Sequence, residues 1–221
     1  MVKCGVDTII MQGNFRYWED VYLGEVDFVS KQGKKIIPWD SKQVDLNLSA
    51  FIHYSNFVGN VLDVGCGLGL ETEFLANAGC KVVGLDISPK CIELAKENVK
   101  SKNAKLVVGD VYTYEPEHKF DMIFDRGLAH NEQENLKELF NKYESLLDEN
   151  GRVYLLMGNH NAKPSKYTEP TRTKLSTVEN ACGDNFKIKL AKEVSMTTHQ
   201  DIDDTIAWNI ILEKKKYGIY I

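Results

Sequence analysis

V-L-D-V-G-C-G-L-G, residues 61–69, is the stretch that decides how this chain folds. Its near-continuous apolar start suits a parallel strand that is covered by helices on both faces. The alternating glycines allow a sharp turn and the close approach of a ligand. A helix expected from Leu70 would present its first N–H groups to the same ligand. The stretch therefore predicts a strand, a tight turn and a helix that together bind a nucleotide.

The spacing of the glycines narrows the choice of ligand. A dinucleotide fingerprint is G-x-G-x-x-G, but Leu70 stands at its third glycine position, and the third glycine here is Gly69. The pattern D-x-G-x-G-x-G resembles the first motif of class I S-adenosylmethionine-dependent methyltransferases. The resemblance implies that Asp63, Gly65, Gly67 and Gly69 accommodate the amino-acid end and the ribose of S-adenosyl-L-methionine. A nicotinamide enzyme and a purely structural turn remain alternatives on this motif alone.

Composition sets the frame for these alternatives. The chain has 221 residues, a length typical of one α/β domain, so we expect a single domain over residues 1–221. Its net charge of −5 argues against a nucleic-acid partner. Five cysteines without a C-x-x-C pair favour a reducing, cytoplasmic location, and no apolar stretch predicts membrane insertion. A small molecule is the expected partner, and the oligomeric state stays open.

Residues 1–57 differ from the rest because they are rich in aromatic side chains and broken by glycines and a proline. They predict an N-terminal cap followed by a helix near residues 44–55, with Asp40 or Ser41 as its N-cap. The aromatic side chains have two interpretations. They pack a loose N-terminus onto the core, or Trp18 and Trp39 line a pocket where they contact a sulfonium cation.

Two further predicted strands end in acids. Residues 81–86 end at Asp86, which can accept hydrogen bonds from both ribose hydroxyls, and residues 106–111 contain Asp110. The methyltransferase resemblance implies that Asp110 meets the adenine amino group. We include the neighbours Ile87 and Val111 in the expected cofactor site. Ser88 and Pro89 predict the start of the intervening helix.

The remaining pattern completes an α/β fold. Strands are predicted at residues 120–127, 153–157, 186–193 and 206–212, and helices are expected after Asn131 and after a capping box at Ser176–Glu179. A polar loop at residues 158–173 is expected to cover the pocket. The fold class is a doubly wound, Rossmann-like sheet of seven strands, mostly parallel with an antiparallel last strand. The N-terminal cap and helix (residues 1–57) precede this core (residues 58–221).

The segment D-R-G-L-A-H, residues 125–130, carries a second resemblance. Together with W-x-x-x-Y at residues 18–22 and P-W-D at residues 38–40, it is similar to elements of the thiopurine, thiol and halide methyltransferases. This resemblance covers roughly residues 15–160. It implies that Arg126 contacts the cofactor carboxylate or the acceptor and that Trp39 helps to close the pocket. Leu128 and Ala129 depart from the familiar pattern, which leaves the acceptor open.

The expected function is methylation of a small molecule, with a thiol as the first choice of acceptor. A thiol ionises near neutral pH without a base, whereas a hydroxyl or an amine would use Asp125 or His130 as general base. The alternative roles are a turn-stabilising Asp125, which is also assigned to the cofactor site, and a structural His130. No metal-ligand spacing is present. An O- or N-methyltransferase and a non-catalytic S-adenosylmethionine-binding partner protein are the remaining hypotheses.

Overall fold

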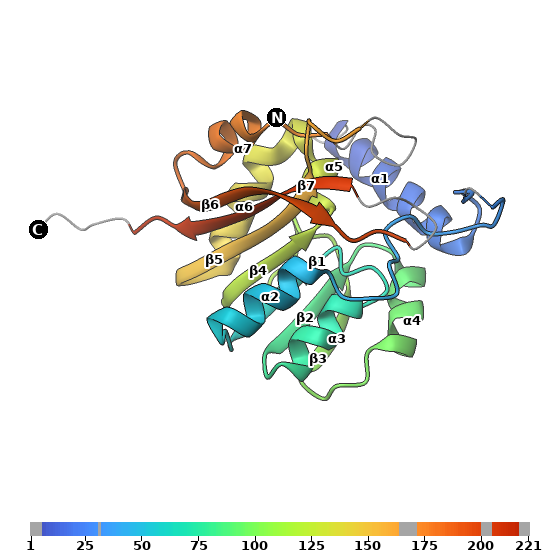
Figure 1. Ribbon diagram of the computed structural model, residues 1–221, viewed down its shortest axis with the longest axis horizontal. Helices are drawn as coiled ribbons and strands as arrows, with labels where there is room; N and C mark the ends of the chain where they lie inside the picture. The colour runs from blue at the N-terminus through green and yellow to red at the C-terminus, as the bar shows by residue number, and fades with distance from the viewer. Residues whose placement is uncertain (1–5, 31, 164–171, 200–204, 217–221) are drawn as a thin grey trace, which may run out of the picture.

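The fold is built around one twisted β-sheet (Figure 1). The computed structural model describes residues 6–30, 32–163, 172–199 and 205–216, with no account of the side chains of residues 6–14. Within these residues the sheet has seven strands in the order β3-β2-β1-β4-β5-β7-β6. The strands are β1 (Asn60–Val64), β2 (Lys81–Asp86), β3 (Ala104–Val108), β4 (Phe120–Arg126), β5 (Leu147–Gly158), β6 (Phe186–Met196) and β7 (Thr205–Lys214).

The direction of the strands confirms the predicted fold class. β1 pairs in parallel with both β2 and β4, and β7 lies antiparallel between β5 and β6. Because the strand order reverses at β1 and β4, the switch point of the sheet lies at their carboxyl ends. Val64 is in register with Leu85 on one side and with Asp125 on the other. The residues that follow these strands therefore meet at one edge.

Helices cover both faces of the sheet, as a parallel sheet requires. The helices are α1 (Val6–Leu23), α2 (Leu46–Ser55), α3 (Leu70–Asn77), α4 (Pro89–Asn98), α5 (Leu128–Asn131), α6 (Leu136–Leu146) and α7 (Leu175–Cys182). Alternation along β1 separates two cores. Val61 packs with α2 and α3, whereas Leu62 and Val64 pack with α6 and α7. Both cores hold the β1 carboxyl end rigidly.

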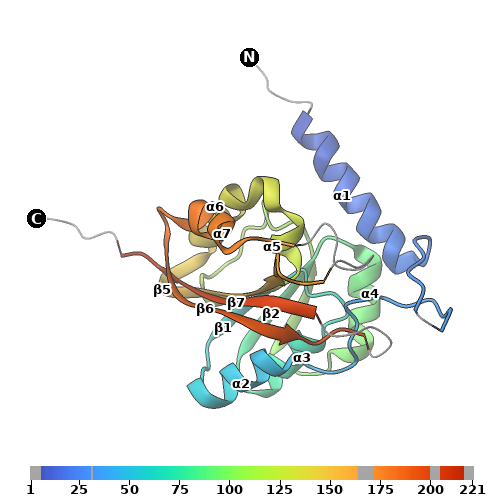
Figure 2. The same ribbon diagram turned by 45° about the horizontal axis from the view of Figure 1, so that its top comes forward.

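The N-terminal region contains a helix that the sequence pattern did not predict. α1 is 18 residues long and projects from the body of the molecule at its N-terminal end (Figure 2). Its C-terminal half packs against α4, where Glu19 Oε2 accepts hydrogen bonds from Ser88 Oγ (2.5 Å) and Lys90 N (3.2 Å). Polar and aromatic residues are mixed on all sides of this helix, so it has no continuous apolar face. The sequence periodicity therefore did not predict it.

Several predicted helix starts were wrong. α2 is capped by Asp45, whose side chain accepts from Asn47 N, and not by Asp40 or Ser41. Asn131 is the last residue of α5, and a short 3-10 turn separates it from α6. The expected capping box also fails, because α7 begins at Leu175 and Lys174 precedes it without a side-chain cap. In each case a nearby polar residue has the residue type preferred at an N-cap, but tertiary packing places the first residue of the helix elsewhere.

Strand boundaries also moved. β3 ends at Val108, before the predicted 106–111 segment is complete, and β5 begins at Leu147, ahead of the predicted strand at residues 153–157. In the part of the chain that is described, no helix is both long and apolar enough to cross a membrane. Residues 164–171 of the predicted covering loop lie outside the described residues.

Candidate functional site

The glycine loop connects β1 to α3 and adopts the conformation that its sequence predicts. Gly65, Gly67 and Gly69 have φ values of 64°, 53° and 77°, in the left-handed region that favours glycine. The turn is closed by hydrogen bonds from Cys66 N to Leu85 O (3.1 Å) and from Gly69 N to Cys66 O (3.0 Å). The loop is therefore fixed against the end of β2.

Gly69 serves the packing of the loop, in contrast to its two neighbours. A Cβ on Gly69 would lie 2.5 Å from Val99 Cγ2, whereas on Gly67 it would lie 3.4 Å from Tyr22 Oη and on Gly65 3.6 Å from Leu128 Cβ. Gly69 therefore lets α4 approach the loop, and Gly65 and Gly67 keep the surface of the loop open to the residues above it.

We expect Gly69→Ala to lower the free energy of unfolding by about 2–4 kcal/mol, from left-handed strain together with overpacking against Val99. Urea denaturation measures this loss. Val99→Ala in the Gly69→Ala background removes the clash but not the strain, so it should restore part of the stability. A loss below about 0.5 kcal/mol, the usual range for unstressed surface changes, would contradict the packing role.

Asp86 and Asp110 lie at the same edge of the sheet, as predicted. Asp86 is buried, and its carboxylate accepts hydrogen bonds from Gly67 N (3.1 Å) and Ser88 N (3.0 Å). Burial raises the pKa of Asp86, and these two N–H donors oppose that rise. Asp110 is half-buried and accepts from Tyr112 N at 2.9 Å. Ile87 follows Asp86 half-buried, and Val111 is buried. Asp86 thus ties the glycine loop to β2.

Asp63 lies beneath the loop and lines the pocket. It is 3% exposed, and its Oδ2 accepts a hydrogen bond of 2.5 Å from Thr72 Oγ1 in α3. Burial raises the pKa of Asp63 to about 8, although the Thr72 hydrogen bond opposes the rise. Asp63 therefore bridges β1 to α3 through Thr72.

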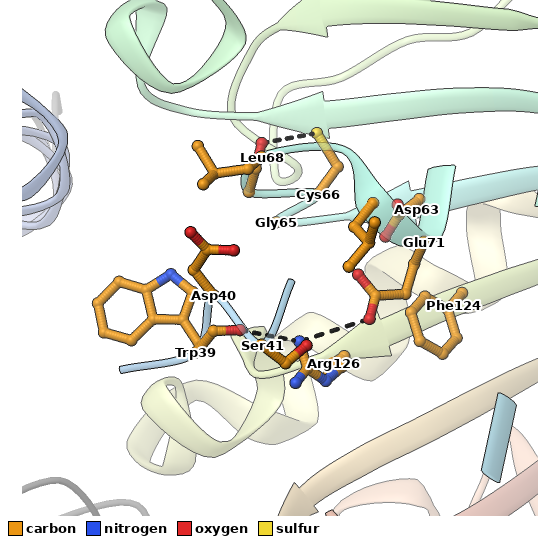
Figure 3. Close-up of a pocket in the computed structure, with 12 residues that line it drawn as sticks. Trp39, Asp40, Ser41, Asp63, Gly65, Cys66, Leu68, Glu71, Phe124 and Arg126 are labelled. Atoms are coloured by element: carbon orange, nitrogen blue, oxygen red, sulfur yellow. Dashed lines mark hydrogen bonds and ion pairs between the residues drawn. The ribbon is translucent and has the colours of Figure 1, made fainter. Parts of the chain in front are cut away.

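Arg126 is the central charge of the pocket (Figure 3). Its guanidinium donates to the carbonyl oxygens of Trp39 (3.3 Å) and Thr197 (2.5 Å), and it lies 3.5 Å from Glu71 Oε1. The Arg126 and Glu71 side chains are 11% and 9% exposed. Burial raises the pKa of Glu71, and the neighbouring guanidinium lowers it. Among the described residues, Arg126 Nε and Glu71 Oε1 have no hydrogen-bond partner. This pair is the strongest electrostatic feature of the site.

Aromatic side chains from the N-terminal region form the roof. Trp39 lies edge-on to Trp18 (ring centroids 5.4 Å apart) and to Phe28 (5.6 Å). Trp39 Nε1 donates to Tyr22 Oη at 3.1 Å. Tyr22 is buried next to Cys91 and Asp86, and burial raises its pKa well above the ordinary value. Trp39 lines the pocket, while Trp18 supports it from α1.

Asp125 lies near the end of β4 and His130 lies in α5, and neither lines the pocket. The Asp125 carboxylate accepts from Leu128 N (2.9 Å), Ala129 N (3.0 Å) and Tyr143 Oη (2.8 Å), and burial raises its pKa to about 6. His130 Nδ1 accepts from Gly158 N at 3.1 Å, so the proton of the neutral ring lies on Nε2. Asp125 anchors α5, and His130 offers a donor at Nε2.

We expect His130 to make the protein less stable in acid. Burial, followed by the charge of Arg126, lowers its pKa from 6.5 to about 4. The neutral ring therefore contributes stability above pH 6.5, and this contribution falls as the pH falls from 6.5 to about 4, by up to about 3 kcal/mol. Asn keeps an acceptor for Gly158 N–H but does not titrate.

Urea denaturation of wild type and His130→Asn at several pH values isolates this contribution. The comparison is needed because Asp63 and Asp125 have raised pKa values and change stability in the opposite direction. The stability difference between wild type and His130→Asn should shrink as the pH falls. A difference that stays constant between pH 7 and pH 4 would contradict the lowered pKa. It would mean that His130 titrates alike in the folded and the unfolded protein.

The pocket brings together five of the thirteen predicted site residues: Trp39, Asp63, Gly65, Gly67 and Arg126. It is lined by residues of β1, the glycine loop, α3, β4 and the segment before α2: Trp39, Asp40, Ser41, Asp63, Gly65, Cys66, Gly67, Leu68, Leu70, Glu71, Phe124 and Arg126. Sequence reasoning did not select Glu71, Tyr22 or Thr197. The W-x-x-x-Y element could have identified Tyr22. The position of Glu71 in the first turn of α3, directly after the glycine loop, could have identified that residue. In the described part of the chain, no three His, Cys, Asp or Glu side chains are grouped to hold a metal.

This geometry defines a class of protein: a Rossmann-like α/β fold with a glycine corner at its switch point. A family model described as "Methyltransferase domain" matches residues 61–151. Residues 61–151 are therefore similar to methyltransferase domains, and two solved structures of this fold contain S-adenosylmethionine or S-adenosyl-l-homocysteine.

Relatives of known name support this assignment. Malonyl-[acyl-carrier protein] O-methyltransferase 1 of Ilyobacter polytropus is 38% identical over 109 residues, which are 48% of this chain and 40% of that protein. Probable thiol methyltransferase 2 of Arabidopsis thaliana is 30% identical over 126 residues, 54% of this chain and 56% of that protein. The chain thus spans about half the length, 40% and 56%, of these curated relatives.

Solved structures share the fold. The structure described as "Conversion of a Disulfide Bond into a Thioacetal Group during Echinomycin Biosynthesis" has a TM-score of 0.80 and 23% identity, and the match covers 93% of both chains. Magnesium protoporphyrin IX methyltransferase of Synechocystis, with bound S-adenosylmethionine, has a TM-score of 0.58 and 20% identity over 77% of this chain and 76% of that one. The first of these covers the N-terminal region as well as the core.

Proposed function

We propose that this chain transfers a methyl group from S-adenosyl-L-methionine to a small molecule, with a thiol as the preferred acceptor. The observation that carries the proposal is the closed corner of the site. The Asp86 carboxylate holds the Gly67 N–H at 3.1 Å, and the pocket beside this loop is lined by Trp39 and the buried Arg126 cation. Such a corner suits a nucleoside with an amino-acid end.

In this proposal, different residues of the chain bind different parts of the cofactor. Asp86 accepts hydrogen bonds from the ribose hydroxyls, and Asp110 accepts one from the adenine amino group. Ile87 and Val111 contact the adenine ring. Gly65 and Gly67 leave room for the ribose and the amino-acid end, and Arg126 binds its carboxylate. Asp86 Oδ2 accepts from Gly67 N and Oδ1 from Ser88 N, which fixes the carboxylate beside the glycine loop.

The proposed acceptor follows from the groups near the catalytic mouth. When bound, the cofactor supplies an electrophilic methyl group on a sulfonium. A thiolate attacks it without a base, and alignment in a dry pocket does most of the work. His130 presents an N–H at Nε2, and Asp125 is engaged by α5 and Tyr143. We therefore assign Asp125 an anchoring role and His130 a donor role, rather than the general-base roles considered from sequence.

Sulfur as the acceptor atom has support from the relatives. Probable thiol methyltransferase 2 of Arabidopsis and the echinomycin structure both concern sulfur chemistry in their names. The 38% identity to a malonyl-[acyl-carrier protein] O-methyltransferase favours a second candidate, an oxygen acceptor such as a carboxylate. A carboxylate, like a thiolate, is already ionised at neutral pH and asks for no base.

An acceptor screen tests the proposal. The purified chain is incubated with S-adenosylmethionine and matched sets of small thiols, carboxylic acids, phenols and amines, and methylated products are identified by mass spectrometry. Thiols should give the highest kcat/KM, and His130→Asn should keep most of the activity because no base is lost. Exclusive methylation of phenols or amines, with activity abolished in His130→Asn or Asp125→Asn, would overturn the sulfur assignment. Cofactor binding without any product would favour the non-catalytic partner protein.

A further inference from the structure

Two segments that are far apart in sequence form one cover over the pocket. We define the paired cover as residues 38–47, which run into the start of α2, and residues 195–199, which begin with the last two residues of β6. His199 N donates to Pro38 O at 3.0 Å, and Asn47 Nδ2 donates to Ser195 O at 2.9 Å. Thr197 N donates to Asp45 Oδ2, also at 3.0 Å. These contacts tie the two segments along their length.

The paired cover is also held from below by Arg126. The guanidinium donates to Trp39 O in the first segment and to Thr197 O in the second. Trp39, Asp40 and Ser41 of the first segment line the pocket directly, as Figure 3 shows for their place around Arg126. A shift of either segment would therefore change the pocket.

Asp45 is the side chain that joins the segments from outside the pocket. It is fully buried at 0% exposure and does not line the cavity. Its Oδ1 accepts from Asn47 N (2.8 Å) and from Asn47 Nδ2 (3.0 Å), which caps α2, and its Oδ2 accepts from Thr197 N. The two oxygens thus have two separate tasks, one local and one across the cover.

The cavity is small for a cofactor, which is why we expect the paired cover to move. The cavity holds about 40 Å³, whereas pockets for small-molecule cofactors are typically about 300–1,000 Å³. The floor of the pocket is the sheet and the glycine loop, which both cores hold in place. The segments above the floor are the parts that can give way when a cofactor enters.

We propose that Asp45 is a positioning residue that makes residues 38–47 and 195–199 open and close as one unit over the cofactor site. The inference rests on the proposed function, because the occupant is S-adenosylmethionine or its product. Without the Asp45 link, residues 195–199 would lose a charged hydrogen-bond acceptor and open independently of residues 38–47. The bound cofactor would then escape through a half-open cover.

The variant Asp45→Asn separates the two tasks of the side chain. Asn is as good an N-cap as Asp, so α2 keeps its cap, but its single side-chain oxygen cannot serve both Asn47 N and Thr197 N. Ser55→Ala is the matched control, because it removes a side-chain acceptor of a backbone N–H (Phe57 N, 3.3 Å) at the other end of α2. If Asp45→Asn does not fold, Asn47→Ala, which removes the bond to Ser195 O, takes its place.

Hydrogen exchange without ligand is the first measurement. In Asp45→Asn, amides of residues 195–199 should exchange roughly tenfold faster than in wild type, as expected for the loss of a hydrogen bond to a charged group, while α2 amides keep their protection. Ser55→Ala should leave residues 195–199 unchanged. Unchanged exchange at residues 195–199 in Asp45→Asn, or equal acceleration throughout α2, would overturn the proposal.

The second measurement is the rate at which S-adenosylhomocysteine is released. Tryptophan fluorescence monitors this release, because Trp39 lines the pocket. We expect Asp45→Asn to release this product roughly tenfold faster than wild type and Ser55→Ala to match wild type. A release rate equal to that of wild type would overturn the proposal even if exchange increases. If wild type does not bind S-adenosylhomocysteine, the proposed function fails, and the exchange experiment still decides whether Asp45 couples the segments.

Discussion

Arg126→Ala is expected to lower the free energy of unfolding by about 3–5 kcal/mol, the cost of leaving a buried charge without its partner. The side chains of Arg126 and Glu71 are 11% and 9% exposed. Within the described residues, Arg126 is the cation that forms an ion pair with Glu71. The substitution also removes the donor to Trp39 O and Thr197 O. Urea denaturation at pH 7 measures the loss.

A double variant distinguishes an isolated charge from lost packing. Arg126→Met with Glu71→Met removes both charges at similar volume and should recover much of the stability, since an apolar pair often replaces a buried ion pair without loss. Lys35→Ala is the control, because it breaks an exposed pair with Asp27 (side chains 68% and 52% exposed) and should cost less than about 1 kcal/mol. An Arg126→Ala loss as small as that of the control would show that the pair does not support the pocket.

Asp86→Ala should weaken the binding of S-adenosylhomocysteine by about 10- to 100-fold, because a hydrogen bond to a charged group is worth about 1.5–3 kcal/mol. The residue has two connections to the site: it is proposed to accept from the ribose, and it holds Gly67 N. Asp86→Asn keeps one acceptor oxygen and should lose less affinity than Asp86→Ala. Calorimetric titration gives the affinity of each variant.

Asp121→Ala provides the matched control for Asp86→Ala. Asp121 also accepts from a backbone N–H, Asn60 N at 2.7 Å, but it lies at the start of β4, at the opposite end of the sheet from the pocket. It should lower stability and leave the affinity unchanged. Equal affinity in wild type and a folded Asp86→Ala variant would place the ribose elsewhere.

The strands of the sheet could be predicted from sequence because their burial imposes a simple pattern. β2 begins and ends where the apolar run does, from Lys81 to Asp86, and β1 differs by one residue at its start. α1 could not be predicted, because its contacts to α4 through Glu19 are long-range and its own sequence has no clear periodicity. The start of α6 was misplaced because Asn131 has the residue type of an N-cap but is the last residue of α5, and a short 3-10 turn separates it from α6.

The cofactor side of the site follows from sequence better than the catalytic side does. Glycines and strand-end acids are fixed by local backbone geometry, so Gly65, Gly67 and Asp86 lie together as expected. The partners of Arg126 are backbone carbonyls 87 and 71 residues away, which no motif encodes. The roles of Asp125 and His130 likewise depend on Tyr143 and on Gly158 N, which only the folded chain brings close.

The central claim, that the glycine corner binds S-adenosylmethionine, is tested most directly by calorimetric titration of the purified chain with S-adenosylmethionine and, in parallel, with NADH. We expect saturable binding of S-adenosylmethionine, weakened in Asp86→Ala and unchanged in Asp121→Ala, and no binding of NADH. Binding of NADH without binding of S-adenosylmethionine would contradict this claim. Residues 61–69 would then be interpreted as a dinucleotide-binding loop.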